Sequence, residues 1–185
     1  SRELDLSTAI FHSSFRARSS YSRDQVTFGR EAFVSRPDQV IVLRLSADRR
    51  GTLDAVVRLG REREAVSRLA GRDRIVMKGR LRQGKGMRFE CHLLVRPKGG
   101  RLVRQDQGIW IQGADEVLIL VAANTDYRGV DPATRCRKQL AVAADRTYGR
   151  LQARHVADYQ GLFNRVSLDL GPSERSALPT DRRLE

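Results

Sequence analysis

The richest combination of chemical groups in this sequence lies in residues 124–131, NTDYRGVD. Within five positions the segment carries an amide at Asn124, a carboxylate at Asp126, a phenol at Tyr127 and a guanidinium at Arg128. Together these groups donate and accept the hydrogen bonds that a hydroxyl-rich ligand requires. The segment follows a strongly apolar run, and loops on rigid supports often carry binding residues. Two interpretations stay open: a polar connection that turns the chain into the next element, which is the favoured one, and a binding set formed by these four residues, which is the best candidate for a functional site.

Patterns typical of metal or cofactor chemistry are absent from the sequence. His12, His92 and His155 are too scattered to suggest a metal site. The sequence contains no HExxH, paired CxxC, Walker-type loop or GxSxG motif. We therefore predict no metal ion and no organic cofactor. His155 falls on an apolar helical stripe, so we expect it to pack or to form a hydrogen bond rather than to act in catalysis.

Acidic and aromatic residues in strand-like runs have structural readings as well as chemical ones. Glu31, Glu90 and Glu116 are expected to be exposed or salt-bridged, because sequence alone pairs none of them with a second carboxylate. The only tryptophan, Trp110, is flanked by Ile109 and Ile111 and must face the side opposite to theirs. We expect Trp110 to pack in a core or an interface, with stacking on a ring-shaped ligand as the alternative.

The two cysteines, Cys91 and Cys136, show no CxxC spacing and no second pair. Cysteine packs as a small hydrophobe, so a buried free thiol is expected for each. Since a disulfide between them stays open as an alternative, the sequence does not fix the redox compartment.

The 185 residues carry a formal net charge of +13. Such a charge favours binding to polyanions such as nucleic acid. Nucleic-acid footprints usually concentrate charge, whereas the 35 basic residues here are spread along the chain and are mostly arginine. We therefore expect a solvated, arginine-rich surface and keep polyanion binding as an alternative function. No apolar run approaches the roughly 20 residues of a membrane span, so no membrane partner is predicted.

Short alternating or apolar runs separated by turn residues occupy the chain up to about Asn124. The clearest run, EVLILVAA, is continuously apolar and predicts a strand buried on both faces. Many short strands with few helices favour an antiparallel β-sandwich. Residues 61–70, REREAVSRLA, are expected to form a loop or a short helix. The predicted strands are 26–34, 39–46, 52–59, 74–79, 87–95, 101–104, 108–112 and 116–123.

The pattern changes to helical at Asp131-Pro132, a typical helix start in which Asp caps and Pro occupies the first turn. A second helix is predicted from about Thr147, and the residues after Gly171 form a polar, proline-containing tail. We expect a mainly β fold with short linker helices. Its parts are a sandwich domain at 1–130, helices at 131–165 and an extended tail at 166–185.

Several segments, in order along the chain, resemble the N-terminal domain of α-L-fucosidase-like enzymes of glycoside hydrolase family 95. The resemblance implies a supersandwich-like β-sandwich whose linker helices lead to a catalytic helical barrel in the same polypeptide. It also implies that the barrel, absent here, carries the catalytic residues, so none is assigned to this chain. The matching segments are SRELDLSTA (1–9), TFGREAFVSRPDQVIV (27–42), 86–94, 113–124 and 153–171.

The resemblance further implies that the parent enzyme removes terminal α-linked fucose, or a related sugar, from glycans. Its partners would be the barrel and, through the barrel, the glycan; residues Asn124, Asp126, Tyr127 and Arg128 would frame the sugar pocket. A free-standing carbohydrate-binding module is a third possibility, which would need an exposed aromatic platform. The first residues show no signal-peptide pattern, and a start at Ser1 suggests a fragment lacking the first part of the sandwich. A secreted or periplasmic location is implied by the family resemblance alone.

Overall fold

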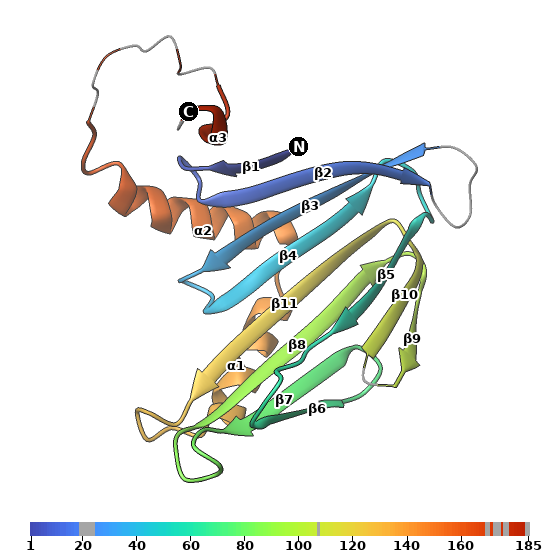
Figure 1. Cartoon of the computed structure of the whole chain (residues 1–185), viewed down its shortest axis with the longest axis vertical. Coiled ribbons are helices and arrows are strands. Elements are labelled where there is room, and N and C mark those ends of the chain that lie inside the picture. Colours follow the sequence, from blue (N-terminus) through green and yellow to red (C-terminus); the bar gives the residue numbers. More distant parts are fainter. Residues whose placement is uncertain (19–24, 107, 169–170, 172–174, 176–177, 184–185) are drawn as a thin grey trace.

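A computed structural model describes residues 1–18, 25–106, 108–168, 171, 175 and 178–183. Two antiparallel sheets dominate the structure (Figure 1). The strands are β1 (Arg2–Asp5), β2 (Ile10–Arg18), β3 (Gln25–Ser35), β4 (Val40–Ala47), β5 (Leu53–Arg58), β6 (Ala65–Leu69), β7 (Arg74–Arg80), β8 (Arg88–Lys98), β9 (Arg101–Gln105), β10 (Gly108–Ala114) and β11 (Glu116–Thr125). The large sheet has the order β1-β2-β3-β4-β11-β8-β7-β6, and the small sheet has the order β5-β10-β9.

The central strand β11 divides the core into two clusters. Leu118 and Leu120 face one cluster, between the large sheet and the helices, whereas Val117 and Ile119 face the other, between the two sheets. All four side chains are at most 8% exposed. The predicted burial of this apolar run on both faces is therefore confirmed, and the predicted mainly β sandwich fold is confirmed with it.

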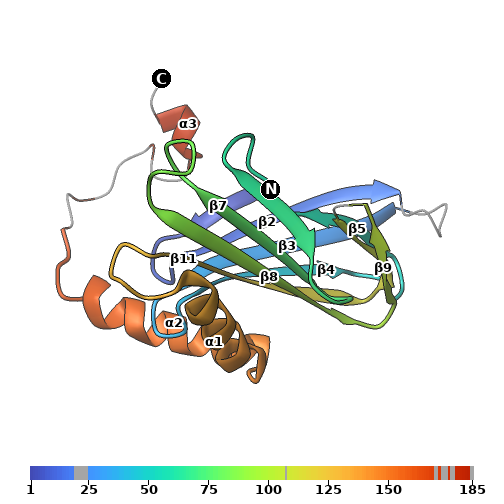
Figure 2. The same ribbon diagram turned by 90° about the horizontal axis from the view of Figure 1, so that it is seen from below.

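The small sheet covers the face of the large sheet that we call the inner face (Figure 2). Ile109 and Ile111 of β10 point into the inter-sheet core and are fully buried. Trp110 between them is half-buried and pairs in register with Val56 and Val103 on the opposite side of the small sheet. The predicted reversal of Trp110 relative to its isoleucine neighbours is confirmed.

Two long helices, α1 (Pro132–Ala144) and α2 (Tyr148–Phe163), follow β11 and lie on the outer face of the large sheet (Figure 1). Helix α1 packs on β11 and β8, and α2 packs on β3. The Asp131 carboxylate accepts a hydrogen bond from Thr134 N at 2.9 Å, and the Thr147 hydroxyl accepts one from Arg150 N at 3.3 Å. Both predicted helix starts are thus confirmed as capped N-termini.

Residues 61–70, expected to be a loop or a short helix, contain the strand β6 instead. Its residues pair with β7, Leu69 opposite Ile75 and Ser67 opposite Met77. Pairing with a neighbouring strand outweighed the helix-forming residues of the segment, because side-chain packing decides strand formation more than local propensity does. Strands β1 and β2 were also not identified from the sequence.

Both cysteines are free thiols in this structure. Cys136 is fully buried, as predicted, and its Sγ donates to the Ala122 carbonyl oxygen at 3.4 Å. Cys91 is half-buried on β8, and desolvation raises its pKa to about 11. Both thiols are therefore protonated and weakly reactive at neutral pH.

The C-terminal part of the chain is only partly described. It includes a four-residue helix, α3 (Thr180–Arg183), and much of the predicted tail after Gly171 lies outside the described residues. No helix in the described ranges combines the length and the apolar character that crossing a membrane requires. The division of the chain at residues 130 and 165 stays a prediction.

Candidate functional site

The predicted binding residue Asn124 lies near the end of β11 and holds α1 against the sheet. Its Nδ2 donates to Gln139 Oε1 at 2.6 Å and to Cys136 Sγ at 3.2 Å. Both partners belong to α1, so the amide group connects strand and helix. This donor is already engaged, which makes Asn124 a supporting residue of the loop that follows it.

Asp126, the second predicted residue, closes the loop onto β8. Its Oδ1 accepts from Arg88 N and its Oδ2 from Arg88 Nε, each at 3.0 Å. These bonds with Arg88 lower the pKa of Asp126. Gly129, which has a positive φ of 71°, donates its N–H to the Asp126 carbonyl oxygen and completes the turn. Asp126 therefore fixes the loop rather than presenting a free carboxylate.

Tyr127 and Arg128 project from this fixed loop into solvent. Tyr127 is 83% exposed, and Arg128 is also exposed. Both line a shallow groove of about 570 Å³ whose floor includes Cys91 and Asn124. The structure thus separates the four predicted residues into two that hold the loop and two that are available to a ligand or to a neighbouring domain.

The acidic residues singled out in the strands are all held in ion pairs. Arg44 lies between Glu31 and Glu116, with nitrogen–oxygen distances of 2.9 and 2.7 Å. The hydrogen bond that Arg44 donates to the Glu116 carboxylate is the largest factor that raises the pKa of Arg44. Glu90 lies 2.7 Å from His92 and 3.4 Å from Lys78. Each of the three carboxylates is therefore in at least one ion pair, as the salt-bridged interpretation predicted.

No group of three or more His, Cys, Asp or Glu side chains suited to a metal ion occurs among the described residues. The hydrogen bonds and ion pairs described above support binding and positioning.

Asp38 is a polar residue with several hydrogen-bond and ion-pair partners. The sequence analysis included it only as part of a segment shared with the family. Its side chain is fully buried and accepts from the Ser35 hydroxyl at 2.8 Å. Arg154 of α2 donates to it at 3.0 Å, and Arg146, just before α2, lies 3.6 Å away. We call these four residues the junction clamp. The signal that could have revealed it was an acidic residue in the turn between two apolar strands, together with arginines in and just before the second helix.

Next to the junction clamp, aromatic residues of α2 make further contacts with the sandwich. The His155 ring stacks on Phe33 of β3 with centroids 4.7 Å apart, and its Nε2 lies 3.0 Å from the Thr8 carbonyl oxygen. Tyr159 donates to the Leu6 carbonyl oxygen at 2.7 Å and stacks on Phe163 at 5.1 Å. The prediction that His155 packs and hydrogen-bonds at the junction is confirmed.

Beyond this packed stretch, the end of α2 exposes apolar side chains. Leu162 is 54% exposed and Phe163 45%, and the following Val166 and Leu168 are more than 80% exposed. Leu6, at the β1–β2 turn held by Tyr159, is 64% exposed. Exposed apolar groups gathered at one end of a helix are typical of a surface that contacts another protein element.

Comparison with known families shows which family has this architecture. A β-sandwich followed by packed helices is the class of N-terminal domain that a glycosyl hydrolase family model describes, and that model matches most of the chain. The chain belongs to the family described as glycosyl hydrolase family 65, N-terminal domain, whose model matches residues 1–130. Residues 147–185 match the glycosyl hydrolase family 95 catalytic domain, so α2 lies within that match.

Curated relatives agree with the resemblance read from the sequence. Alpha-L-fucosidase 2 of Arabidopsis thaliana is 33% identical over 93% of this chain. Alpha-fucosidase A of Aspergillus niger is 28% identical over 95% of this chain. The chain spans 24% of the length of each. The predicted similarity to the N-terminal region of fucosidase-like enzymes is confirmed.

A solved structure supports the same fold. A kojibiose phosphorylase from the human microbiome superposes with a TM-score of 0.56 at 10% identity. The match covers 85% of this chain and 24% of the other. At this identity the similarity concerns the fold alone.

Proposed function

We propose that this chain is the non-catalytic N-terminal part of a glycoside hydrolase that removes terminal α-linked fucose, or a related sugar, from glycans. Its partner is a catalytic helical barrel in the same polypeptide, which binds the glycan. The similarity to two fucosidases over more than nine-tenths of the chain supports this substrate class.

The single observation that carries the proposal is the junction clamp. It joins a motif of the family 65 sandwich match, at Asp38, to α2, which lies in the family 95 catalytic match. A buried ion pair of this kind fixes the relative orientation of the two elements that it joins more than it adds stability, because its geometry is restrictive. The sandwich therefore sets the position and angle of the first helix leading into the catalytic domain.

In this proposal, Tyr127 and Arg128 face the barrel and contribute to the rim of its sugar pocket. Both side chains are exposed on a loop held by Asp126 and Arg88. A rigidly held loop can present a phenol and a guanidinium at low conformational cost. Replacing both with alanine in the full enzyme should raise the Michaelis constant for a fucosylated oligosaccharide; unchanged kinetics would contradict a role at the rim.

The experiment that tests the supporting role is Asp38→Asn in the full polypeptide, with fucose release from an aryl α-L-fucoside as the readout. The substitution keeps the shape of the side chain but removes the charge between two arginines. We expect a stability loss of about 3 kcal/mol, as for a broken buried ion pair. We also expect kcat to fall at temperatures where the variant remains folded.

The matched control is Asp158→Asn, which removes the exposed pair between Arg36 and Asp158 at 2.7 Å on the same helix. Exposed pairs contribute little, so stability should change by less than about 1 kcal/mol and activity should stay constant. If folded Asp38→Asn enzyme retains full kcat, the positioning role is wrong. If the full wild-type polypeptide releases no fucose, the substrate assignment is wrong.

A further inference from the structure

A hollow of about 960 Å³ lies beside α1, on the outer face of β6, β7 and β8. Alternate residues of these strands form its floor. Arg68 pairs in register with Val76, which pairs with His92, and the next row is Val66, Lys78 and Glu90. Pro132, at the start of α1, closes one side. We call this hollow the β7 groove.

Cationic side chains dominate the β7 groove. Six basic residues line it against two acidic ones, Glu64 and Glu90. The Glu90 carboxylate is already occupied by His92 and Lys78, and Glu64 accepts from Gln83 N at 3.0 Å and lies 3.9 Å from Arg61. The acidic groups therefore do not neutralise the remaining cations. The six basic residues are Arg68, Arg74, Lys78, Arg80, Arg88 and Arg137.

Half of these cations have no acidic partner within the described ranges. Arg74 lies 3.8 Å from Asp73, and Arg88 binds Asp126. By contrast, Arg80 donates only to the Gly86 carbonyl oxygen and Arg137 to the Thr134 hydroxyl. Arg68 has no ion pair among the described residues and is exposed on the edge strand β6, as are Arg80 and Arg137 on their elements. Their guanidinium groups are therefore available to an anion from outside.

The cations extend along the groove instead of converging on one point. Arg74, Lys78 and Arg80 are on the same face of β7, and the six residue steps from Arg74 to Arg80 cover about 20 Å of strand. Arg68 and Arg88 flank this line on the neighbouring strands. A linear array of this length suits an extended polymer with repeated negative charges, whereas a single small anion would use only one or two of the groups.

We propose that the β7 groove binds an anionic oligosaccharide, one that carries carboxylate or sulfate groups on successive sugars. Arginine forms bidentate hydrogen bonds with both groups. The apolar side chains of Val66, which is 60% exposed, and Val76 offer contact to the carbon faces of the sugar rings. The groove would hold a charged region of a glycan independently of the sugar that the enzyme removes, so this inference goes beyond the proposed function.

The lining disfavours nucleic acid as the occupant. Single-stranded nucleic acid needs aromatic faces on which its bases stack. Phe89 is the one Phe, Tyr or Trp in the lining, and Arg61 lies over its ring with the guanidinium carbon 5.1 Å from the ring centroid. His92 is buried and bound to Glu90. No free ring remains in this described lining for base stacking.

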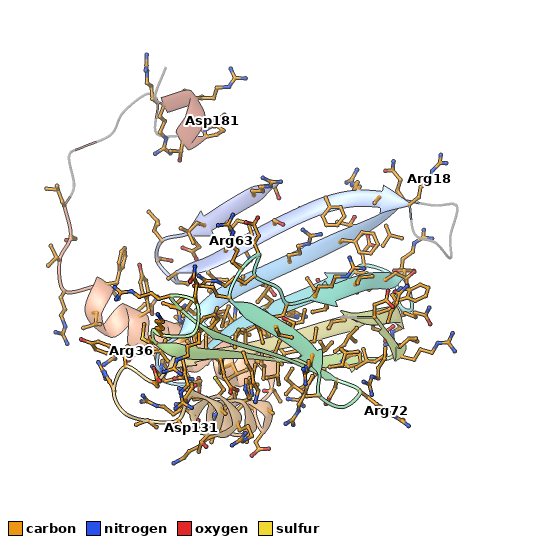
Figure 3. All side chains as sticks on the ribbon, turned by 60° about the horizontal axis from the view of Figure 1, so that its bottom comes forward. Arg18, Arg36, Arg63, Arg72, Asp131 and Asp181 are labelled. Carbon is orange, nitrogen blue, oxygen red and sulfur yellow. The ribbon has the colours of Figure 1, made fainter. Side chains whose placement is uncertain are left out.

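The test is a calorimetric titration of the full polypeptide with a hexamer of galacturonate, which carries one carboxylate per sugar. Its methyl ester, which is neutral, is the matched control ligand. The double variant Arg68→Gln/Arg74→Gln removes two groove cations. Arg18→Gln/Arg104→Gln removes two exposed cations on β2 and β9, and Figure 3 shows Arg18 at a far end of the sheet.

We expect the galacturonate hexamer to bind, the ester to bind at least tenfold more weakly, and the groove variant to lose about tenfold or more in affinity, since charge-assisted hydrogen bonds are the strong ones. The control variant should bind within about twofold of wild type.

Equal binding of acid and ester, or equal losses in both variants, would overturn the proposal. Tighter binding of a single-stranded oligonucleotide with the same number of charges would overturn it in favour of nucleic acid. Absence of binding by the full polypeptide would show that another domain occupies the groove and would also overturn it. None of these outcomes depends on fucose release.

Discussion

Each half of the large sheet is covered only in part, and the exposed surfaces of the two halves lie on opposite faces of the sheet. In the half formed by β1 to β4, α2 covers the outer face, and the inner face exposes Phe11, Val34 and Ile41. In the half formed by β8, β7 and β6, the small sheet covers the inner face, and the outer face carries the cationic β7 groove. The uncovered surfaces are therefore apolar in one half and charged in the other.

This difference indicates that the two surfaces have different binding roles. Contiguous exposed apolar groups are costly in water and usually mark a contact with another protein surface. Arginine and lysine remain well solvated and bind anions without needing to be covered. Figure 3 shows Arg18, Arg36 and Arg72 at separate edges of the molecule, as the spread of basic residues along the sequence predicted. The β7 groove is a local concentration within that wider distribution.

The largest expected effect concerns β11, which both halves share. Leu120→Ala removes a fully buried side chain from the core beneath the helices. We expect it to lower the free energy of unfolding by about 2–5 kcal/mol in a denaturant titration. Val34→Ala, on the uncovered inner face at 66% exposure, should change that energy by no more than about 0.5 kcal/mol. Similar losses in the two variants would mean that the inner face of β3 is covered in solution.

An intermediate effect is expected in the half that carries the groove. A Cβ atom at Gly79 would lie 2.2 Å from the Phe89 ring and 2.3 Å from the Glu64 carbonyl oxygen. Gly79→Ala should therefore destabilise the protein by about 1–3 kcal/mol, as overpacking does. Gly149→Ala is the control in α2, where a Cβ has open space, and should be neutral or stabilising. Equal thermal midpoints for the two variants would contradict the close approach of Phe89 and Glu64 to Gly79.

The smallest effect concerns the start of α1, which lies between the two halves. Hydrogen bonds from Thr134 lower the pKa of Asp131 below its ordinary value of 3.8. A lowered folded-state pKa stabilises the fold above the ordinary pKa, and this contribution is lost as the pH falls through the folded value. Asp131→Asn should therefore unfold at a lower temperature than wild type at neutral pH, and the two midpoints should converge well below pH 3.8.

The corresponding control is Thr147→Ser at the cap of α2, because a hydroxyl does not titrate in this range. Its difference from wild type should stay constant between neutral and acidic pH. If the Asp131→Asn difference is equally constant, the charge of Asp131 does not contribute to the cap.

Prediction from the sequence succeeded where one local signal was unopposed. The continuous apolar run of β11 has no polar face to turn toward water, so it must be buried on both faces. Asp131-Pro132 allows few structures other than a helix start. The prediction for residues 61–70 was wrong for the opposite reason. Their helix-forming composition competed with a strand pattern in Ala65 to Leu69, and only pairing with β7 decided between them.

The candidate site was predicted in part. The loop after β11 was identified from its mixture of groups. No local pattern separates Asn124 and Asp126, which hold the loop, from Tyr127 and Arg128, which are exposed. That separation depends on Gln139 and Arg88, which lie 15 and 38 positions away. Partners this distant are chosen by sheet register and helix packing.

By itself, the sequence determined the mainly β fold, the two helix starts, the reversed orientation of Trp110 and the resemblance to fucosidase-like enzymes, because period, caps and motifs are local properties of the chain. Only the tertiary structure decided that Asp38 clamps α2 and that basic residues from three strands and a helix meet in one groove. Charges far apart in sequence are brought together by strand order, and strand order is set by long-range pairing that no short segment encodes.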